Sequence, residues 1–167
     1  GKWIKAMPHE GFAVDYSIEF PHPLIGRQQL SFDCTPESFA RNVAKARTFG
    51  FLHEVEMLRQ NGLALGGSLE NAVVLDEYGV LNDDGLRYKD EFVRHKVLDF
   101  VGDMAMAELP LWGRFEVFAS GHALNNEFLR HITDNADEYL CEMHLSGVGM
   151  AAHGAPLRPA VAEAAIA

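Results

Sequence analysis

The sequence is poor in cysteine: its 167 residues contain only Cys34 and Cys141. Two cysteines are too few for a disulfide framework, and neither belongs to a Cys-x-x-Cys pair or a zinc-ribbon spacing, so we expect a reducing compartment, the cytoplasm. The sequence also lacks any apolar run that approaches the ~18 residues of a membrane-spanning helix. No stable membrane insertion is therefore expected.

Positive charge is scarce as well. The chain has 14 Lys and Arg against 24 Asp and Glu, which gives a formal net charge of -10. Such an acidic chain is repelled by a phosphate backbone unless a basic patch overcomes the repulsion, and the sequence contains no such patch. We therefore expect no nucleic-acid partner.

Several familiar catalytic signatures are missing. The sequence contains no Gly-x-Ser-x-Gly nucleophile elbow, no His-Glu-x-x-His pair and no dinucleotide-binding fingerprint. Gly66-Gly67-Ser68 is not a phosphate-binding loop, because the Lys-Ser/Thr that follows the spaced glycines of such a loop is absent. The chemistry of the chain must rest on another arrangement.

Hydrophobic periodicity predicts both strands and helices. Apolar and polar residues alternate over Phe12–Phe20, as is typical of a half-buried strand, and a 3.6-residue apolar period over 92–107 predicts the clearest helix. Thr35-Pro36-Glu37 is typical of a helix N-terminus and predicts a helix to about residue 47. Further strands are predicted at 29–33, 71–75 and 113–119, and further helices at 52–60 and 122–132.

These elements predict an α+β fold, a two-layer sandwich in which two main helices, at 35–47 and 92–107, cover a small and mainly antiparallel sheet. The stretch 48–86 holds short elements punctuated by glycine, which predicts a β-α-β insertion. We expect residues 1–146 to form this domain and residues 147–167, with few large side chains, to form a flexible tail.

A polar ridge on the predicted helix 92–107 is the strongest candidate for chemistry. His95, Asp99 and Asp103 follow one another at four-residue spacing, so they share a face opposite the apolar one. An imidazole and a carboxylate one turn apart can bind a divalent metal such as zinc, and a second carboxylate can orient a ligand or steer a proton. The alternative is an exposed helix face with a His/Asp ion pair.

His122 is the second candidate. It follows Ser120-Gly121 at a predicted strand-to-helix junction, where a side chain can point into a cleft and donate a proton. Alternatively, Ser120 caps the helix and His122 is exposed in its first turn. Asn125 and Asn126 could hold a backbone or a substrate, or could be polar surface.

Thr48-Phe49-Gly50 is a weaker candidate. It offers a hydroxyl, an aromatic ring and a flexible pivot at a break between elements. This pattern is typical of a substrate rim, and equally of a loop anchored by a buried Phe.

Four motifs in order, covering about residues 12–128, resemble the carboxy-terminal half of the UDP-3-O-acyl-N-acetylglucosamine deacetylase family. They are Arg47-Thr48-Phe49-Gly50-Phe51, Gly66-Gly67-Ser68, the segment DEFVRHKVLDFVGD from Asp90 to Asp103, and Ser120-Gly121-His122-Ala123-Leu124-Asn125-Asn126. The resemblance implies a zinc-dependent amidase that removes acetate from a UDP-linked acylated glucosamine in the lipid A biosynthesis of Gram-negative bacteria.

The resemblance also implies catalytic roles. It gives His95 and Asp99 as zinc ligands, His122 as the general acid, Asp103 as the group that orients His122, and Thr48 as the hydrogen-bond donor to the oxyanion. Such an assignment is chemically coherent, because zinc acidifies a bound water and a leaving amine needs a proton.

Substrate contacts follow from the same resemblance. Phe49 would line the substrate site, Lys96 would face the diphosphate or oxyanion region, and Phe20 would stack on uracil. The insertion would wall a tunnel for the fatty acyl chain with Leu52, Val55, Ala64, Gly67, Ser68 and Ala72.

Two features depart from the family pattern. The family's amino-terminal domain supplies a Glu base and a third His ligand from a Glu-His pair, and this sequence contains no such dipeptide. The family commonly has Lys where Ala119 precedes Ser120, so one positive contact to phosphate is lost. The resemblance therefore predicts a nearly inactive chain that needs the absent domain as its partner. A non-catalytic module that binds nucleotide sugars or acyl chains is the alternative.

Overall fold

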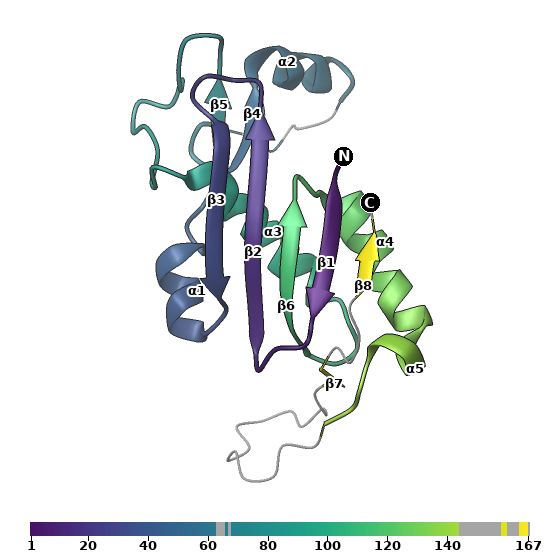
Figure 1. Ribbon diagram of the computed structural model, residues 1–167. Helices are drawn as coiled ribbons and strands as arrows, with labels where there is room; N and C mark the ends of the chain where they lie inside the picture. The colour runs from purple at the N-terminus through teal and green to yellow at the C-terminus, as the bar shows by residue number, and fades with distance from the viewer. Residues whose placement is uncertain (63–65, 67, 144–157, 160–163, 167) are drawn as a thin grey trace.

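The computed structural model describes residues 1–62, 66, 68–143, 158–159 and 164–166 (Figure 1). Its main sheet has the strand order β3-β2-β6-β1-β8, with β7 paired to β6. The strands are β1 (Trp3–Met7), β2 (Phe12–Phe20), β3 (Gly26–Asp33), β6 (Leu111–Phe118), β7 (Arg158–Pro159) and β8 (Ala164–Ile166). The helices are α1 (Pro36–Asn42), α2 (Leu52–Gln60), α3 (Glu91–Met104), α4 (His122–Asp134) and α5 (Ala136–Tyr139).

The fold class predicted from the sequence is confirmed. β2 pairs with β3, β1 with β6 and β1 with β8 in antiparallel fashion, whereas β2 and β6 run parallel. Figure 1 shows α3 and α4 packed on one face of this sheet, which gives two layers. Among the described residues, none of the helices is both long and apolar enough to cross a membrane.

One of the two covering helices differs from the prediction. α3 packs on β2 and β3, but the second cover is α4, which packs beside α3 and over β1. α4 buries Phe128, Leu129 and Ile132, whereas α1 buries none of its residues. From the sequence, the helix at 35–47 was expected to be the second helix that covers the sheet. That prediction was wrong because hydrophobic periodicity shows which face of a helix is apolar but not which strands this face will cover.

Helix α1 is also shorter than predicted: it ends at Asn42 instead of about residue 47. The N-terminus is as expected, because the Thr35 side chain accepts a hydrogen bond from the Ser38 backbone N–H. Beyond it, the Arg47 backbone N–H donates to the Glu91 carboxylate, 44 residues away in sequence. The helix ends at the C-cap residue Val43, whose φ of -130° is not helical, and the Arg47 N–H is used in the long-range bond.

The β-α-β insertion is present. β4 (Thr48–Phe51) and β5 (Ala72–Leu75) pair in parallel and are joined through α2, as a parallel pair requires a crossover. At Gly50 an added Cβ would lie 3.3 Å from Val55 Cγ2, so the glycine lets α2 pack closely on β4. From the sequence, Thr48–Phe51 was expected to be a break between elements. The structure shows that it is a strand, which is formed by pairing with β5.

The sheet gathers several chain segments at one end. β2 and β6 are parallel, so they terminate, at Phe20 and Phe118, at the same end of the sheet. The antiparallel β1 begins at this end with Trp3. β1 was not predicted, because only its Ile4 and Ala6 are fully buried. Part of the expected tail also joins the sheet, since Ala164–Ile166 pair with β1.

Candidate active site

A cleft of about 430 Å3 opens at this end of the sheet. Its lining brings together seven residues to which the family resemblance assigns a role, from β2, β4, α3 and α4. The lining residues are Lys2, Ile18, Glu19, Phe20, Thr48, Phe49, His95, Lys96, Asp99, Ala119, Ser120, Gly121 and His122. Residues distant in sequence therefore share one concave site.

The ridge on α3 lies against this cleft. His95 Nε2 is 3.2 Å from Asp99 Oδ1, and both side chains are only 15% exposed. Asp103, one turn further, is buried. The alternative of an open, solvated His/Asp pair is therefore wrong, because the side chains that close the cleft shield this face.

His95 is suited to metal ligation. Burial lowers the pKa of His95, and the nearby Asp99 carboxylate and the Ala46 backbone carbonyl only partly offset that effect. Its buried Nδ1 has no hydrogen-bond partner among the described residues, whereas its Nε2 faces the Asp99 carboxylate. A neutral imidazole is the form that binds a metal.

The distance between the two side chains is compatible with zinc binding. Two ligand atoms at about 2.0 to 2.1 Å from a tetrahedral zinc lie about 3.3 Å apart, close to the 3.2 Å between His95 Nε2 and Asp99 Oδ1. Within the described part of the chain, no group of three or more His, Cys, Asp or Glu side chains is arranged to hold a metal. The residues present thus fit two positions of a zinc site.

His122 stands across the cleft from this pair. It begins α4, its Nδ1 lies 2.8 Å from Asp103 Oδ2, and its Nε2 lies 4.0 Å from Asp99 Oδ2. The alternative for this junction is half right: His122 is exposed in the first turn of α4, as it states, but the N-cap residue is Gly121. Ser120 does not cap the helix, and its Oγ donates to Asn125 Oδ1 at 2.5 Å. His122 is 67% exposed, and its ring is held from one side by Asp103.

Thr48 reaches the cleft because its neighbour is firmly anchored. Arg47 is 3% exposed, and its Nε donates to Glu91 Oε1 at 3.0 Å. Glu91 lies one turn before His95 on α3, so this ion pair fixes the start of β4 beside the ridge. The Arg47 guanidinium also bonds to Asp84, at the far end of the insertion.

Aromatic rings form one wall of the site. Phe49 lies edge-on to Phe20, Phe92 and His95, with ring centroids 5.6, 5.0 and 6.5 Å apart. Lys96 lines the cleft, where its Nζ donates to Asp99 Oδ2 at 3.4 Å. The site thus combines an apolar wall with two lysines, Lys2 and Lys96, and an acid–base cluster.

The predicted acyl-tunnel residues are dispersed over the insertion. Leu52 lines a separate pocket of about 460 Å3, while Val55, Ser68 and Ala72 lie outside that lining. The Ser68 hydroxyl accepts from the Glu70 backbone N–H and so supports a local turn. Two further residues of this prediction, Ala64 and Gly67, lie outside the described residues.

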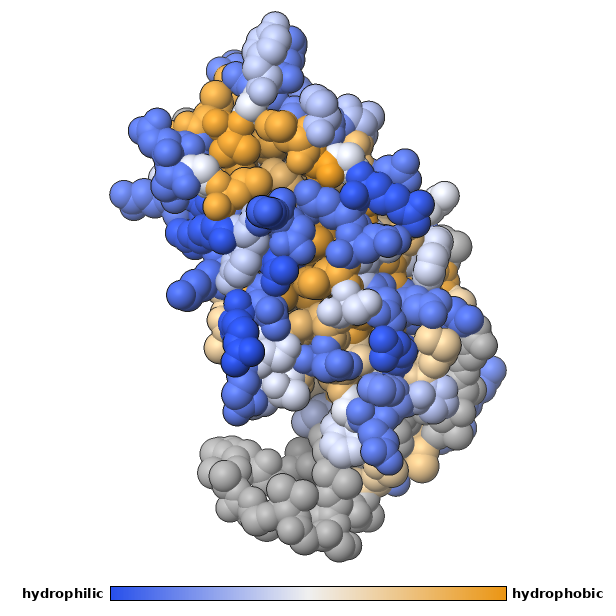
Figure 2. Space-filling model, turned by 60° about the vertical axis from the view of Figure 1, so that its left-hand side comes forward, coloured by the Kyte–Doolittle hydropathy of each residue, from blue (hydrophilic) through white to orange (hydrophobic). Residues whose placement is uncertain are grey.

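The insertion carries a hydrophobic surface. Figure 2 shows apolar side chains gathered toward the end of the molecule that holds β4, α2 and β5. Large exposed apolar residues of this end include Leu24, Leu52, Met57 and Leu69.

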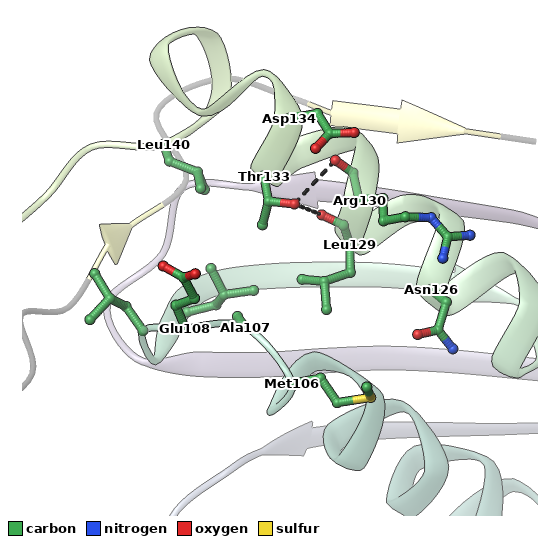
Figure 3. A pocket seen from close by; sticks show the side chains of 11 residues that line it. Met106, Ala107, Glu108, Asn126, Leu129, Arg130, Thr133, Asp134 and Leu140 are labelled. Carbon is green, nitrogen blue, oxygen red and sulfur yellow. Dashed lines mark hydrogen bonds between the residues drawn. The ribbon is translucent and has the colours of Figure 1, made fainter.

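Another pocket, of about 460 Å3, lies between α4 and the segment that follows α3 (Figure 3). It shares no lining residue with the cleft. Figure 3 shows Glu108, Arg130 and Asp134 around it, and Thr133 turned back to bond the α4 backbone. The cleft remains the candidate site because the acid–base cluster lies there.

Several residues of the site were not expected from the sequence. Lys2, Ile18 and Glu19 line the cleft, and Asn125 holds Asp103 from beneath. The only sequence signal for Ile18 and Glu19 is their place near the end of a predicted strand that leads to Phe20. The sequence marked Asn125 as able to hold a backbone or a substrate, but its buried bond to Asp103 was not expected, because a polar residue in a first helical turn is usually exposed.

Comparisons with known proteins place this α+β domain in a protein family. The family profile described as UDP-3-O-acyl N-acetylglycosamine deacetylase (LpxC) matches residues 1–134. The chain is 61% identical over 160 residues to a UDP-3-O-acyl-N-acetylglucosamine deacetylase of Oleidesulfovibrio alaskensis, with 96% of this chain and 52% of the relative covered. Proteins of the same name in Nitratidesulfovibrio vulgaris and Lawsonia intracellularis are 66% and 58% identical, with 96% and 80% of this chain and 51% and 43% of the relatives covered.

The chain belongs to the UDP-3-O-acyl N-acetylglycosamine deacetylase family. It spans about half the length of the curated relatives that it matches most fully.

Proposed function

We propose that this chain is the carboxy-terminal domain of an enzyme that hydrolyses the N-acetyl group of UDP-3-O-acyl-N-acetylglucosamine in lipid A biosynthesis. One observation carries the proposal: His95, Asp99, His122 and Thr48 line one cleft in a chain of the deacetylase family. The proposed reaction breaks the amide bond with water and releases acetate and a free amine.

We assign zinc as the cofactor, with His95 Nε2 and Asp99 as two of its ligands. Support comes from the 3.2 Å separation of their ligand atoms and from the lowered pKa of His95. When bound, zinc would supply Lewis acidity that activates water and polarises the acetyl carbonyl. The glutamate base and the third histidine ligand would come from the absent amino-terminal domain.

His122 is the proposed general acid. Its Nδ1 bonds to Asp103, which leaves Nε2 directed to the cleft at 4.0 Å from the Asp99 carboxylate. Protonated on both nitrogens, the ring would deliver the Nε2 proton to the departing amine. Asp103 accepts from Nδ1 and so fixes the direction of the ring.

The remaining residues of the cleft position the substrate. Thr48 would donate a hydrogen bond to the carbonyl oxygen as negative charge develops on it, and Lys96 would attract the diphosphate. Phe20 and Phe49 offer an aromatic surface to the uracil and the sugar. The exposed apolar side chains of the insertion would contact the acyl chain. The cytoplasmic location of the protein is a prediction from the sequence.

The proposal is tested in the full-length protein encoded by the natural reading frame, by measuring acetate release from UDP-3-O-acyl-N-acetylglucosamine. We expect activity in the wild type and a loss of about 10²- to 10⁴-fold in His122→Ala. His131→Ala, in the same helix but outside the cleft, is the matched control and should retain activity. Substrate binding without acetate release would instead favour the non-catalytic module.

A further inference from the structure

A chain of buried hydrogen bonds lies beneath the proposed general acid. Asn125 is 0% exposed, and its Nδ2 donates to Asp103 Oδ2 at 2.7 Å. The same oxygen accepts from His122 Nδ1 at 2.8 Å. One carboxylate oxygen therefore joins the exposed ring to a fully enclosed amide.

The orientation of this amide is determined by its two partners. An ionised carboxylate only accepts hydrogen bonds, so the side-chain NH₂ of Asn125 must face Asp103. Its oxygen then faces Ser120, whose hydroxyl donates to it at 2.5 Å. If the amide were reversed, its oxygen would face the Asp103 carboxylate and that contact would be lost, so the carboxylate sets the orientation of the amide.

Ser120 is itself anchored to the sheet. The hydroxyl of Tyr16, on β2, donates to the Ser120 backbone carbonyl at 2.9 Å. Burial, together with the Asp99 and Asp103 carboxylates, raises the pKa of Tyr16 above its ordinary value, so the phenol keeps the proton it donates. The chain of bonds thus runs from a rigid central strand to the catalytic cleft.

We propose that Asn125 is a positioning residue: it holds the Asp103 carboxylate so that His122 carries its proton on Nδ1 and presents Nε2 to the substrate. The catalytic part of this assignment rests on the proposed function. Without the Asn125 bond, Asp103 would retain His122 as a partner but could turn about its terminal torsion. The imidazole would then lose its fixed acceptor, and its tautomer would no longer be set.

The first test measures the His122 tautomer in this chain, labelled with ¹⁵N-histidine, at about pH 9, where an ordinary imidazole is neutral. A His122→Gln variant assigns the signals. In wild type we expect mainly the Nδ1–H form. In Asn125→Ala and Asn125→Leu the ratio of Nδ1–H to Nε2–H should fall about fivefold.

Asn125→Leu keeps the number and branching of the side-chain heavy atoms and leaves no cavity, so a shift in both variants excludes a cavity effect. Unfolding midpoints verify that each variant is folded. Asn126→Ala is the matched control, since Asn126 bonds the His122 backbone carbonyl and not the Asp103 carboxylate. An unchanged tautomer in Asn125→Leu, or an equal shift in Asn126→Ala, would overturn the proposal.

The second test concerns the full-length enzyme. Asn125→Leu should lower kcat about 10- to 100-fold with KM unchanged, because the residue acts through His122 and does not touch the substrate. A shifted tautomer with unchanged kcat would overturn the catalytic part. The tautomer measurement requires neither zinc nor substrate, so its result does not depend on the proposed function. Failure of the proposed function would be recognised separately, because the wild type would then release no acetate.

Discussion

Arg47 and Glu91 form an enclosed ion pair whose side chains are 2% and 0% exposed, with Nε 3.0 Å from Oε1. Glu91 also accepts from the backbone N–H groups of Arg47 and Arg87. The pair joins α3, which carries His95, to both ends of the insertion. Its hydrogen bonds offset the cost of burying two charges.

Removal of the carboxylate charge should therefore be costly. We expect Glu91→Gln to lower the free energy of unfolding by about 3 kcal/mol, because the buried Arg47 guanidinium would keep only the exposed Asp84 carboxylate as counter-ion. Asp15→Asn is the matched control, since the Asp15–Arg114 pair is 30% and 37% exposed, and it should cost less than about 1 kcal/mol. Urea unfolding measures both, and equal losses would contradict the expectation.

The same pair predicts a dependence of stability on pH. Burial by itself raises the pKa of Glu91, but hydrogen bonds from Arg47 and Arg87 outweigh it and hold the pKa below the ordinary 4.5. A depressed carboxylate pKa stabilises the fold above the unfolded value, and this contribution is lost as the pH falls through the folded value. The unfolding free energy should therefore decline below pH 4.5, measured by urea titration across that range. The decline should be shallower in Glu91→Gln; an identical slope would exclude Glu91 as its source.

Zinc binding to this chain should be weak and should depend on His95. A titration against a chromophoric chelator at neutral pH should show an affinity that His95→Ala reduces by at least about tenfold. His131→Ala, which removes an imidazole outside the cleft, should leave the affinity unchanged. Equal binding by wild type and His95→Ala would refute the assigned ligand.

Thr48 should act through its hydroxyl. In the full-length protein, Thr48→Val should lower kcat about 10²-fold, as expected for the loss of one donor to a developing oxyanion. Thr48→Ser keeps the hydroxyl and should retain most of the activity. Thr133→Val serves as the control, because the Thr133 hydroxyl bonds only to the α4 backbone. Equal rates for Thr48→Val and wild type would remove Thr48 from the mechanism.

Ala119 adopts a left-handed backbone conformation, with φ of 50°, between β6 and the residues that lead to His122. Glycine carries no Cβ penalty there, so Ala119→Gly should raise the unfolding free energy by about 0.5 kcal/mol after its greater unfolded-state entropy is counted. Ala123→Gly, in the exposed first turn of α4, should lower it by about 1 kcal/mol. Thermal unfolding of the two variants should shift in opposite directions.

The sequence predicted those features that local periodicity encodes. The alternation over Phe12–Phe20 gave the bounds of β2, and the four-residue spacing gave the ridge of His95, Asp99 and Asp103. The β-α-β insertion was likewise marked by its short segments and glycines. Each of these depends on neighbours close in the chain, whose side chains repeat with the period of a strand or a helix.

Other features were decided only by contacts between distant residues. The Arg47–Glu91 pair fixes residue 47 beside α3, where β4 begins at Thr48. The site also needs β2, β6 and β1 to have their termini at the same end of the sheet. Asn125 is the sharpest case, because its buried bond to Asp103 spans 22 positions. By itself the sequence determined most of the helices and strands and the four-residue spacing of His95, Asp99 and Asp103. Only the tertiary structure decided which side chains meet, since their approach depends on how the sheet and helices pack.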